Sequence, residues 1–569
     1  MGYLTRKWLI CAAWPYINAI PHLGTMIGSV LSADVSARYF RIKGDKVVFV
    51  SGSDEHGTPI EVEAIRKRIK PEELTNRNHK IVKDLFDKWW ISFDNYTRTE
   101  SEIHKKFVRD FYMVLYNKGY IFEKEDEMPY CPVDKMFLPD RFIVGRCPYC
   151  GYEDAKGDQC DSCGRLLTPL TLVDPKCAIC GTKPISKKTK HWYIDLKKLE
   201  RTLRDYIENN KQLPANARRM SLSILKEGLK ARSLTRDNKW GIPAPFPGAS
   251  GKTIYVWMEA VLGYISATIE YFKKIGEPEG WREFWLSNDT RSVYFIGKDN
   301  IPFHTLIFPA LLIASGEKYV LPWTVASTEY LLFEGQKFSK SRRIGVWIDE
   351  ALELLPVDYW RFVLIYFRPE LRDINFSWKS MVNIVNSLLN DTIGNFIHRV
   401  LSMIWKNLRG EIRRPEYLQE YYNQVLEELK DRIKKVEENM EKFRLRDALL
   451  EVVGIASLGN KFLNETRPWE KLKKIPKEGE TILYIAFRIA KALAVLLYPF
   501  IPMSAQRLWK MLGYFKEISW EEAISDIDSV HRINRPEPLF RKIDPKDLEE
   551  ILKRLEYIRN NRLVPSARV

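Results

Sequence analysis

The sequence lacks a long apolar segment that is free of charge. Its most apolar stretch, residues 482–503, contains Arg488, Lys491 and Pro499, and is expected to form a buried bundle helix rather than a membrane span. The first ten residues also lack the extended apolar core of a signal peptide. We therefore expect neither a membrane protein nor a secreted one, and predict a cytoplasmic location.

Cysteine is scarce outside one short region, and internal repeats and low-complexity tracts are missing. Seven of the eight cysteines lie in the segment from Cys131 to Cys180, while Cys11 is expected in the core of a first strand. The Cys-x2-Cys spacing of that segment is typical of metal ligands and differs from a dispersed disulfide framework. It indicates a reducing compartment.

The cysteine pairs predict two metal sites. Two neighbouring knuckles predict a closed, tetrahedral, structural zinc site, with a redox-active dithiol as the alternative. The ligands of this first site are Cys147, Cys150, Cys160 and Cys163. A third pair predicts a possible second site, with an aspartate as fourth ligand by spacing; without it, the pair would be free thiols at a turn. The ligands of this second site are Cys131, Asp134, Cys177 and Cys180.

The length, composition and charge of the chain limit the classes of protein to which it can belong. The chain has 569 residues, several times the usual domain length, which predicts three or four domains. Hydrophobic residues make up 45% and charged residues 29%, enough for large globular cores. The net charge of +16 fits a phosphate-rich partner, although a solvated Lys/Glu surface, as in heat-stable proteins, would give the same excess.

The order of apolar segments predicts an α/β fold with a parallel sheet. A helix over residues 22–39 is expected between the first two strands, and residues 122–190, which lack helical periodicity, are expected to form an insertion. The predicted sheet strands are residues 7–13, 46–50, 253–257 and 292–297. In such a sheet, ligands bind at the carboxyl ends of the strands.

Beyond about residue 380 the chain is predicted to be helical. Glu428 faces Arg432 one turn further along, and residues 545–559 are expected to form an amphipathic helix. Apolar residues recur at helical spacing, as at Val425, Leu429, Ile433 and Val436. A helical bundle should therefore follow the sheet.

Two short motifs more than three hundred residues apart suit the handling of a nucleotide. His22-Leu23-Gly24-Thr25 is predicted where a strand turns into a helix, and there free N–H groups and a glycine permit close approach of phosphate and ribose. Lys337-Phe338-Ser339-Lys340-Ser341 has the composition of a mobile loop, whose lysines could stabilise charge on a transferring phosphate. Taken alone, the first motif is better explained as a helix cap and the second as a solvated turn.

Together the two motifs resemble the signatures of class I aminoacyl-tRNA synthetases. The matching residues are His22, Gly24, Lys337, Ser339, Lys340 and Ser341, while Thr25 replaces a second histidine. The resemblance implies a split Rossmann-like catalytic domain with an inserted zinc-knuckle domain, followed by an all-α anticodon-binding bundle. It implies catalytic roles for His22, Lys337 and Lys340, and Mg²⁺ bound with ATP. The implied ATP-binding residues are His22, Gly24, Thr25, Gly297, Lys298, Asp299 and Lys340.

Within that class, the sequence is similar to archaeal-type members of the methionyl-tRNA synthetase family over almost its whole length. Four segments match in order, namely residues 13–18, 54–59, 255–264 and 295–304. By this resemblance a carboxylate would pair with the amino group of methionine, and aromatic rings would enclose its sulfur. The implied methionine-binding residues are Ala13, Trp14, Tyr16, Asp54, Trp257, Ala260, Tyr264, Phe303 and His304. A metal site at Asp54-Glu55-His56 is not expected, because adjacent strand residues point to opposite faces.

The helical region contains residues suited to unpaired RNA bases. Asn395 and Arg399 are four residues apart and share a helix face, and an exposed Trp469 after Pro468 would offer a stacking platform. In the family that this chain resembles, the positions matching these four residues read the anticodon. The alternative for each is plain helix surface or core.

The resemblance implies attachment of methionine to tRNA(Met) in two steps, namely ATP-dependent formation of methionyl-adenylate and its transfer to the terminal ribose. One alternative is another class I synthetase, for leucine, isoleucine or valine, but the large editing insertion of those enzymes is missing. Another is a non-catalytic zinc-bearing RNA-binding protein, against which His22 and Lys340 argue. A dimerisation module resembling that of the family is also missing, which favours a monomer.

These inferences divide the chain into six segments. The two catalytic halves are expected at residues 1–120 and 231–325, on either side of the zinc-knuckle insertion at 121–230. The signature-loop and stem-contact region follows at 326–384, the anticodon-binding bundle at 385–540, and the C-terminal helix and tail at 541–569.

Overall fold

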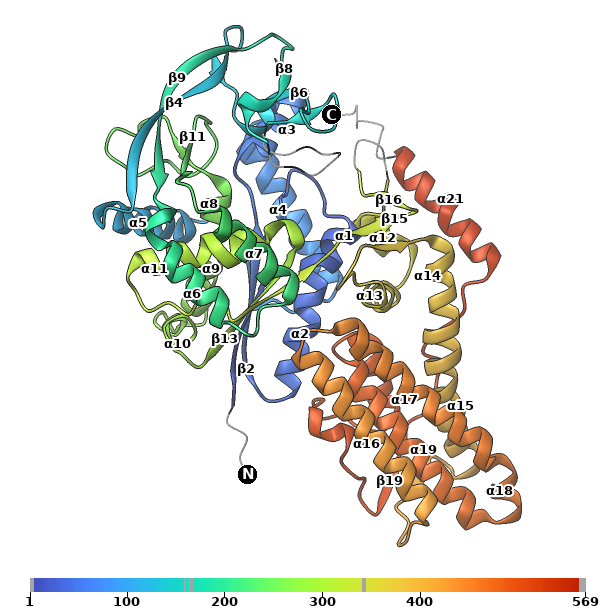
Figure 1. The fold of residues 1–569 in the computed structure, drawn as a ribbon. Helices are drawn as coiled ribbons and strands as arrows, with labels where there is room; N and C mark the ends of the chain where they lie inside the picture. Colours follow the sequence, from blue (N-terminus) through green and yellow to red (C-terminus); the bar gives the residue numbers. More distant parts are fainter. Residues whose placement is uncertain are drawn as a thin grey trace.

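The computed structural model describes residues 5–157, 160, 162, 165, 167–339 and 344–561. Figure 1 shows a lobe built on a central sheet, a β-rich insertion at the top and a helical bundle that extends to the lower right. Among the described residues, no helix combines the length and the apolar character needed to cross a bilayer.

The central sheet has five parallel strands in the order β14-β13-β1-β2-β3. The strands are β1 (Lys7–Ala12), β2 (Lys46–Ser53), β3 (Asn95–Arg98), β13 (Thr290–Gly297) and β14 (Thr324–Thr328). From β1, the chain adds β2 and β3 on one side of the sheet and β13 and β14 on the other, so the strand order reverses beside β1. This switch point is where open α/β sheets bind their ligands, and the predicted parallel sheet is confirmed.

Successive side chains of β1 point to opposite faces of the sheet, and each face packs in its own core layer. Trp8 and Ile10 pack with α2 (Leu31–Ile42) and the bundle, while Leu9 and Cys11 pack on the other face. Helices α5 (Glu102–Asn117), α9 (Gly263–Lys274) and α11 (Phe308–Ser315) cover that other face. The sheet is thus buried on both faces, as expected for parallel strands.

The helix predicted after the first strand is confirmed. It runs through α1 (Leu23–Thr25), a π-helical turn at Met26–Val30 and α2. The strand predicted at residues 253–257 is wrong. Only β12 (Thr253–Ile254) is extended, pairing antiparallel with β11 (Thr235–Arg236), and the chain then turns into α8 (Val256–Ala260). The physical reason is tertiary, because β2 and β13 already occupy both sides of β1 and this segment packs at the end of the sheet instead.

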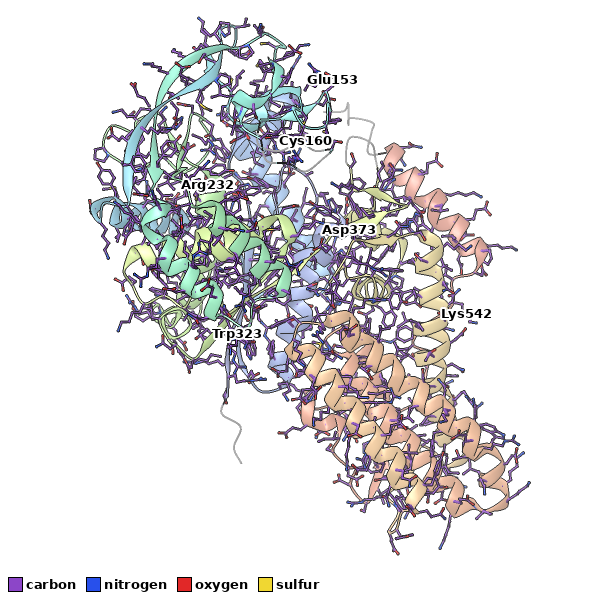
Figure 2. The ribbon with its side chains drawn as sticks, viewed as in Figure 1. Glu153, Cys160, Arg232, Trp323, Asp373 and Lys542 are labelled. Carbon is purple, nitrogen blue, oxygen red and sulfur yellow. The ribbon has the colours of Figure 1, made fainter. Side chains whose placement is uncertain are left out.

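The insertion is built on a long antiparallel pair, β4 (Ile121–Cys131) and β9 (Ile185–Ile194). A small three-stranded sheet lies between them in sequence, formed by β6 (Ile143–Arg146), β7 (Ala155–Lys156) and β8 (Val173–Cys177). The pair carries this small sheet to the top of the molecule, where Cys160 is labelled in Figure 2. The expected non-helical insertion is confirmed.

The region after β14 leads into the bundle. A small sheet of β15 (Leu331–Phe333), β16 (Gln336–Lys337) and β17 (Ile374–Phe376) precedes it, together with α12 (Ile348–Leu354) and α13 (Val357–Tyr366). The helices that follow are α14 (Trp378–Ile384), the π-helix η7 (Val385–Gly394), α15 (Asn395–Asn407), α16 (Glu420–Glu441), α17 (Leu445–Thr466), α18 (Pro468–Lys474), α19 (Pro476–Leu497), α20 (Pro502–Met511) and α21 (Pro545–Asn561). The predicted buried helix is α19, and the predicted Glu428–Arg432 pair forms at 3.0 Å.

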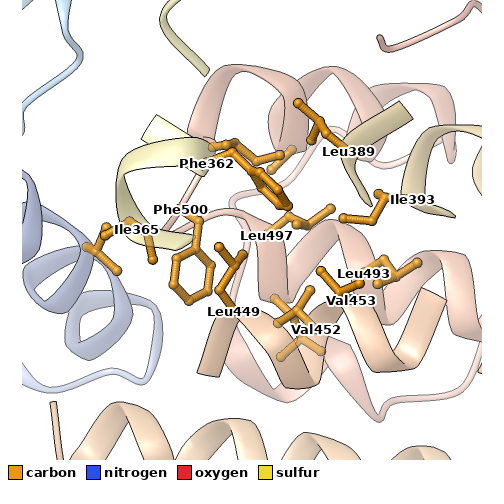
Figure 3. Packing of buried hydrophobic residues seen from close by; sticks show 14 of the residues in the cluster. Phe362, Ile365, Leu389, Ile393, Leu449, Val452, Val453, Leu493, Leu497 and Phe500 are labelled. Carbon is orange, nitrogen blue, oxygen red and sulfur yellow. The ribbon is translucent and has the colours of Figure 1, made fainter. Parts of the chain in front are cut away.

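One apolar core joins the sheet to the bundle. Figure 3 shows Phe362 and Ile365 of α13 packed among residues of η7, α17 and α19, such as Ile393, Val453 and Leu497. The same cluster reaches β1. The bundle is therefore fixed to the sheet lobe at its base, while α18 lies at its far tip (Figure 1).

Candidate functional site

A cavity of about 610 Å³ lies at the carboxyl ends of the central strands. It is bounded by the loops after β1, β13 and β14, by α1 and by the segment that begins at β16. The lining includes Ala13, Trp14, Tyr16, Asn18, His22, Gly24, Thr25, Gly28, Ser29, Gly297, Asn300, Thr328, Glu329, Tyr330, Lys337, Phe338 and Trp347. Segments far apart in the sequence therefore meet where the fold predicts a ligand.

The two signature motifs meet face to face in this cavity. The ring of His22 stacks on that of Phe338, with centroids 4.5 Å apart and planes at 15°. The backbone of His22 also forms an antiparallel bridge with Trp347, just beyond the second motif. The predicted convergence of the motifs is thus seen directly in the residues that the structure describes.

The backbone of Ser339, in the second motif, pairs with that of Ile344, just beyond it. Ser339 N donates to Ile344 O, and Ile344 N to Ser339 O, both at 2.9 Å. Lys337 lies two residues before Ser339, with Nζ 4.9 Å from the centre of the Tyr330 ring. Lys340, predicted to be catalytic, lies outside the described residues.

His22 caps the helix that carries its motif. Its Nδ1 accepts a hydrogen bond from Thr25 N at 3.2 Å, and burial lowers the pKa of His22 to about 4. The ring is therefore neutral near pH 7 and carries its proton on Nε2. A Cβ on Gly24 would come to 3.0 Å from the ring, so a side chain here would push against the His22 ring. His22 supplies a hydrogen-bond donor to this cavity rather than a charge.

Two of the residues predicted to bind ATP lie in an ion network at the cavity rim. Lys298 Nζ is 2.7 Å from Glu329 and 3.2 Å from Asp373, which is labelled in Figure 2. Asp299 accepts a hydrogen bond from the hydroxyl of Tyr330 at 2.6 Å. The positive charge of Lys298 is thus matched by protein carboxylates, and this network holds the loops after β13 and β14 together.

Asp54 follows β2 at the same end of the sheet and is buried. Its backbone is fixed by a bond from Asp54 N to Pro15 O at 2.9 Å and one from Ile17 N to Asp54 O at 3.2 Å. Burial, followed by the charge of Glu259, raises its pKa. In the described part of the chain its Oδ1 meets no hydrogen-bond partner. A buried carboxylate oxygen in this state suits a cationic group of a ligand.

Aromatic residues predicted to enclose methionine come together beside Asp54. Trp257 on α8 donates from Nε1 to the hydroxyl of Tyr16 at 3.0 Å, and its ring meets the edge of Phe303 at 4.7 Å. Ala260 ends the same helix. Arg232, labelled in Figure 2, lies over the Phe303 ring at 4.9 Å and was missed from the sequence, where a lone arginine carries no signal.

Tyr264 and His304 form the inner part of this group. His304 Nδ1 is 2.9 Å from the carbonyl of Asn300, so Nδ1 donates and Nε2 accepts. The hydroxyl of Tyr264 therefore donates to His304 Nε2 at 2.9 Å. Burial lowers the pKa of His304 to about 4, which keeps this ring neutral. In this conformation the Tyr264 proton is committed to His304, which leaves the oxygen lone pairs of Tyr264 for other contacts.

Trp14 is held in a slot between two glycines. A Cβ on Gly52 or on Gly263 would come within 2.6 Å of the Trp14 ring, so neither position admits a side chain. Ala13 precedes this ring and is bonded through its N–H to Phe295 O at 3.0 Å. The loop after β1 is thus positioned against both β2 and α9.

Both cysteine clusters assemble as the spacing predicts. In the second site, Asp134 Oδ2 lies 3.1 Å from the sulfurs of both Cys131 and Cys177, and all four ligand atoms, including that of Cys180, lie within 4.8 Å of one another. Asp134 thus lies beside the three cysteines with which its spacing groups it. Four converging donors of this kind fit zinc.

The first cluster is described by three of its four predicted ligands. The sulfurs of Cys147, Cys150 and Cys160 lie within 4.8 Å of one another, and Cys163 lies outside the described residues. Cys147 N donates to Tyr152 O at 2.8 Å, which closes the knuckle. The corresponding bond in the other cluster, from Cys177 N to Thr182 O, measures 2.9 Å, so the two knuckles share one geometry.

The predicted RNA-reading residues lie together at the tip of the bundle. The guanidinium of Arg399 is 5.5 Å from the centre of the Trp469 ring and donates to Asn464 Oδ1 at 3.2 Å. Pro468 is buried and starts α18 after a left-handed residue, which leaves Trp469 40% exposed. Asn395 is exposed one turn before Arg399 on α15. An open aromatic face beside a cation suits unpaired bases.

Some cavity residues were missed from the sequence. Glu329 and Tyr330 follow β14, a strand that the sequence analysis did not predict, so their position at the carboxyl edge was hidden. Trp347 lies only a few residues beyond the second motif, and that proximity is a usable signal. His56 and Glu259, adjacent to predicted site residues, form a buried pair described below.

Comparisons with known proteins agree with this geometry. The family model described as "tRNA synthetases class I (M)" matches residues 8–401, and the one described as "Anticodon binding domain of methionyl tRNA ligase" matches residues 416–560. The fold and site are therefore those of a class I tRNA synthetase.

Relatives define the family more closely. The chain is 58% identical to the methionine–tRNA ligase of Caldivirga maquilingensis, over 97% of this chain and 94% of the relative, and 58% identical to that of Thermofilum pendens, over 98% and 99%. A structure of Mycobacterium tuberculosis methionyl-tRNA synthetase in complex with methionyl-adenylate shares the fold, with a TM-score of 0.79 at 22% identity over 94% of this chain and 100% of that one. The chain belongs to the methionine–tRNA ligase family.

Proposed function

We propose the following division of labour for the ligase reaction. Asp54 binds the ammonium group of methionine, and the aromatic group encloses its side chain. That group comprises Trp14, Tyr16, Trp257, Tyr264, Phe303 and His304, with Ala13 and Ala260 completing the wall. ATP lies along His22, Gly24, Thr25 and Gly297, with Mg²⁺ on its phosphates and Lys298 and Asp299 at the rim. The contact between His22 and Phe338 carries this proposal, since it brings both signatures to one cavity.

In the first step, an oxygen of the methionine carboxylate attacks the α-phosphorus of ATP, and the bond to the β-phosphate oxygen breaks. Pyrophosphate leaves, and methionyl-adenylate remains. His22 donates a hydrogen bond from Nε2, while Lys337 and Lys340 balance the charge that builds on the phosphates. In the second step, a hydroxyl of the terminal tRNA ribose attacks the methionyl carbonyl and AMP leaves. Catalysis rests on positioning and electrostatics.

The tRNA is proposed to meet the enzyme at both ends. Asn395, Arg399, Pro468 and Trp469 would read the anticodon of tRNA(Met), and the acceptor end would enter the catalytic cavity past the insertion. In the insertion, the two cysteine clusters would hold structural zinc and keep the small sheet folded. The domain limits given above are proposed to separate these roles. Thiol ligands suit a reducing cytoplasm, and we propose a monomer there.

Exchange of labelled pyrophosphate into ATP tests the lysine roles. We expect Lys337→Ala and Lys340→Ala to lose methionine-dependent exchange by about 100-fold or more, while tRNA binding persists. Lys273→Ala, which alters an exposed lysine on α9, is the control and should match the parent. Normal exchange in both signature variants would exclude the proposed roles.

A further inference from the structure

The segment Asp54-Glu55-His56 contains a histidine to which the proposed mechanism gives no role. His56 is completely buried, and both of its ring nitrogens meet carboxylates. Nδ1 contacts Glu259, and Nε2 lies 2.6 Å from Glu100 Oε1. Ionised carboxylates offer only acceptors, so both nitrogens donate when Glu100 and Glu259 are charged, and the ring is then an imidazolium.

The surrounding charges support that protonation state. Although burial opposes it, Glu259 and Glu100 raise the pKa of His56 to about 10. Burial likewise opposes ionisation of Glu100, but His56 and then Lys105 lower its pKa to about 2. His104, which packs nearby against Trp14, stays neutral because burial lowers its pKa to about 3.

The carboxylates around His56 differ in which cations neutralise their charge. Glu55 is bound by Arg98 at 2.8 Å, and Glu100 by Lys105 at 3.2 Å. Within the described residues, the ion pair recorded for Glu259 is with His56, and its second oxygen meets no partner. Without the imidazolium, the charge of Glu259, which raises the pKa of Asp54, would lose its counter-ion.

The His56–Glu259 contact also joins the two halves of the amino-acid site. His56 follows Asp54 by two residues, on the loop that would bind the ammonium group. Glu259 lies on α8 between Trp257 and Ala260, on the helix that would enclose the side chain. The ion pair therefore fixes the distance between the two groups that recognise the opposite ends of methionine.

We infer that His56 is a positioning residue for methionine: its imidazolium neutralises Glu259, favours the ionised form of Asp54 for the substrate ammonium group, and holds α8 against the Asp54 loop. The inference rests on the proposed role of Asp54. When His56 is neutral or absent, Asp54 and Glu259 share a proton, because two close buried carboxylates do not both ionise. The ammonium group of methionine then binds a pair of carboxylates that carry one negative charge between them instead of two.

The test is His56→Gln, compared with the double variant His56→Gln/Glu259→Gln. At pH 7 we expect His56→Gln to raise the KM for methionine by about tenfold or more, while the KM for ATP stays nearly unchanged. A tenfold loss corresponds to raising the pKa of Asp54 by about one unit. In the single variant the KM for methionine should fall as pH rises from 6 to 8.5, since the shared proton leaves, whereas the parent should vary little. The double variant removes both the cation and the anion that it balances, so it should recover most of the affinity and lose the pH dependence.

Three outcomes would overturn the inference. They are equal increases in both KM values, a pH-independent defect, and a double variant that binds methionine no better than the single one. Thermal unfolding identifies variants that fail to fold; if the single variant fails, the double variant alone must fold and bind methionine. Asp54→Asn separates the two claims, because a normal KM for methionine in that variant would refute the proposed role of Asp54 itself.

Discussion

The catalytic end of the sheet and the tip of the bundle are built in opposite ways. At the sheet, Asp54 and Glu259 are buried and each has a carboxylate oxygen that meets no partner within the described chain. At the tip, Trp469 is 40% exposed and Arg399 lies beside it, in an exposed hydrogen bond to Asn464. Removing a group from the first site leaves a buried charge uncompensated, which costs several kcal/mol, whereas removing one from the second exchanges protein for water. We therefore expect a single substitution to abolish amino-acid binding at the first site, but only to weaken RNA binding at the second.

The largest expected effect is at Asp54. Asp54→Asn keeps the shape of the side chain but removes the charge that would pair with the ammonium group. We expect the KM for methionine in pyrophosphate exchange to rise on the order of 100-fold, as for a buried charged pair that loses one partner. Asp110→Asn, an exposed aspartate on α5, is the matched control. A change below threefold would place the ammonium group elsewhere.

The next effect concerns the insertion, which belongs to neither site. Each cluster should bind one zinc ion, so Cys150→Ser and Cys180→Ser should each lose one ion, measured by elemental analysis. Because zinc holds the small sheet folded, we expect tRNA charging to fall about 10- to 100-fold and methionine exchange to change less. Full zinc content in either variant would contradict the ligand sets.

A smaller effect is expected at the bundle tip. Trp469→Ala should raise the KM for tRNA about 5- to 10-fold, the lower end of the roughly 1–3 kcal/mol that stacking on one base is worth. Trp469→Phe should retain part of that affinity. Trp405, equally exposed at 40% on α15, provides the matched control as Trp405→Ala. If both tryptophan-to-alanine variants charge tRNA alike, the tip does not read bases.

The smallest expected effect is the dependence of exchange activity and of thermal stability on pH. His22 and His304 have pKa values lowered to about 4 by burial, so both stay neutral from pH 6 to 8 and should give exchange no inflection near 6.5. The unfolded chain, however, protonates them below about 6.5. Because the folded pKa is the lower one, stability should decline as pH falls from about 6.5 to 4. His22→Gln should reduce that slope in thermal unfolding; an unchanged slope would contradict a neutral, buried ring.

The sequence predicted the elements whose signals are local. The turn at His22, the cysteine spacing and the helical period of α16 each depend on neighbours within a few residues, and each is confirmed. Asp134 was found because its spacing from Cys131 completes a ligand set. The helix at residues 256–260 was missed because β-branched and aromatic residues favour strands locally, while its packing beneath Phe303 is tertiary.

The electrostatics of the site could not be predicted from sequence. That His56 is charged and His22 neutral follows only from what surrounds each ring, since both start from the same intrinsic pKa. The pairing of His56 with Glu259 joins residues 203 positions apart. Likewise, the contact of Arg399 with Trp469 could be placed on one surface only after the bundle was seen.

Pyrophosphate exchange and tRNA charging, measured side by side for His22→Ala and Trp469→Ala, test most directly whether the two sites work separately. We predict that His22→Ala loses methionine-dependent exchange by about 100-fold while tRNA binding stays normal, as expected when a phosphate-contacting donor is removed. Trp469→Ala should exchange at the parental rate and fail only in charging. Equal loss of exchange in both variants would contradict this account.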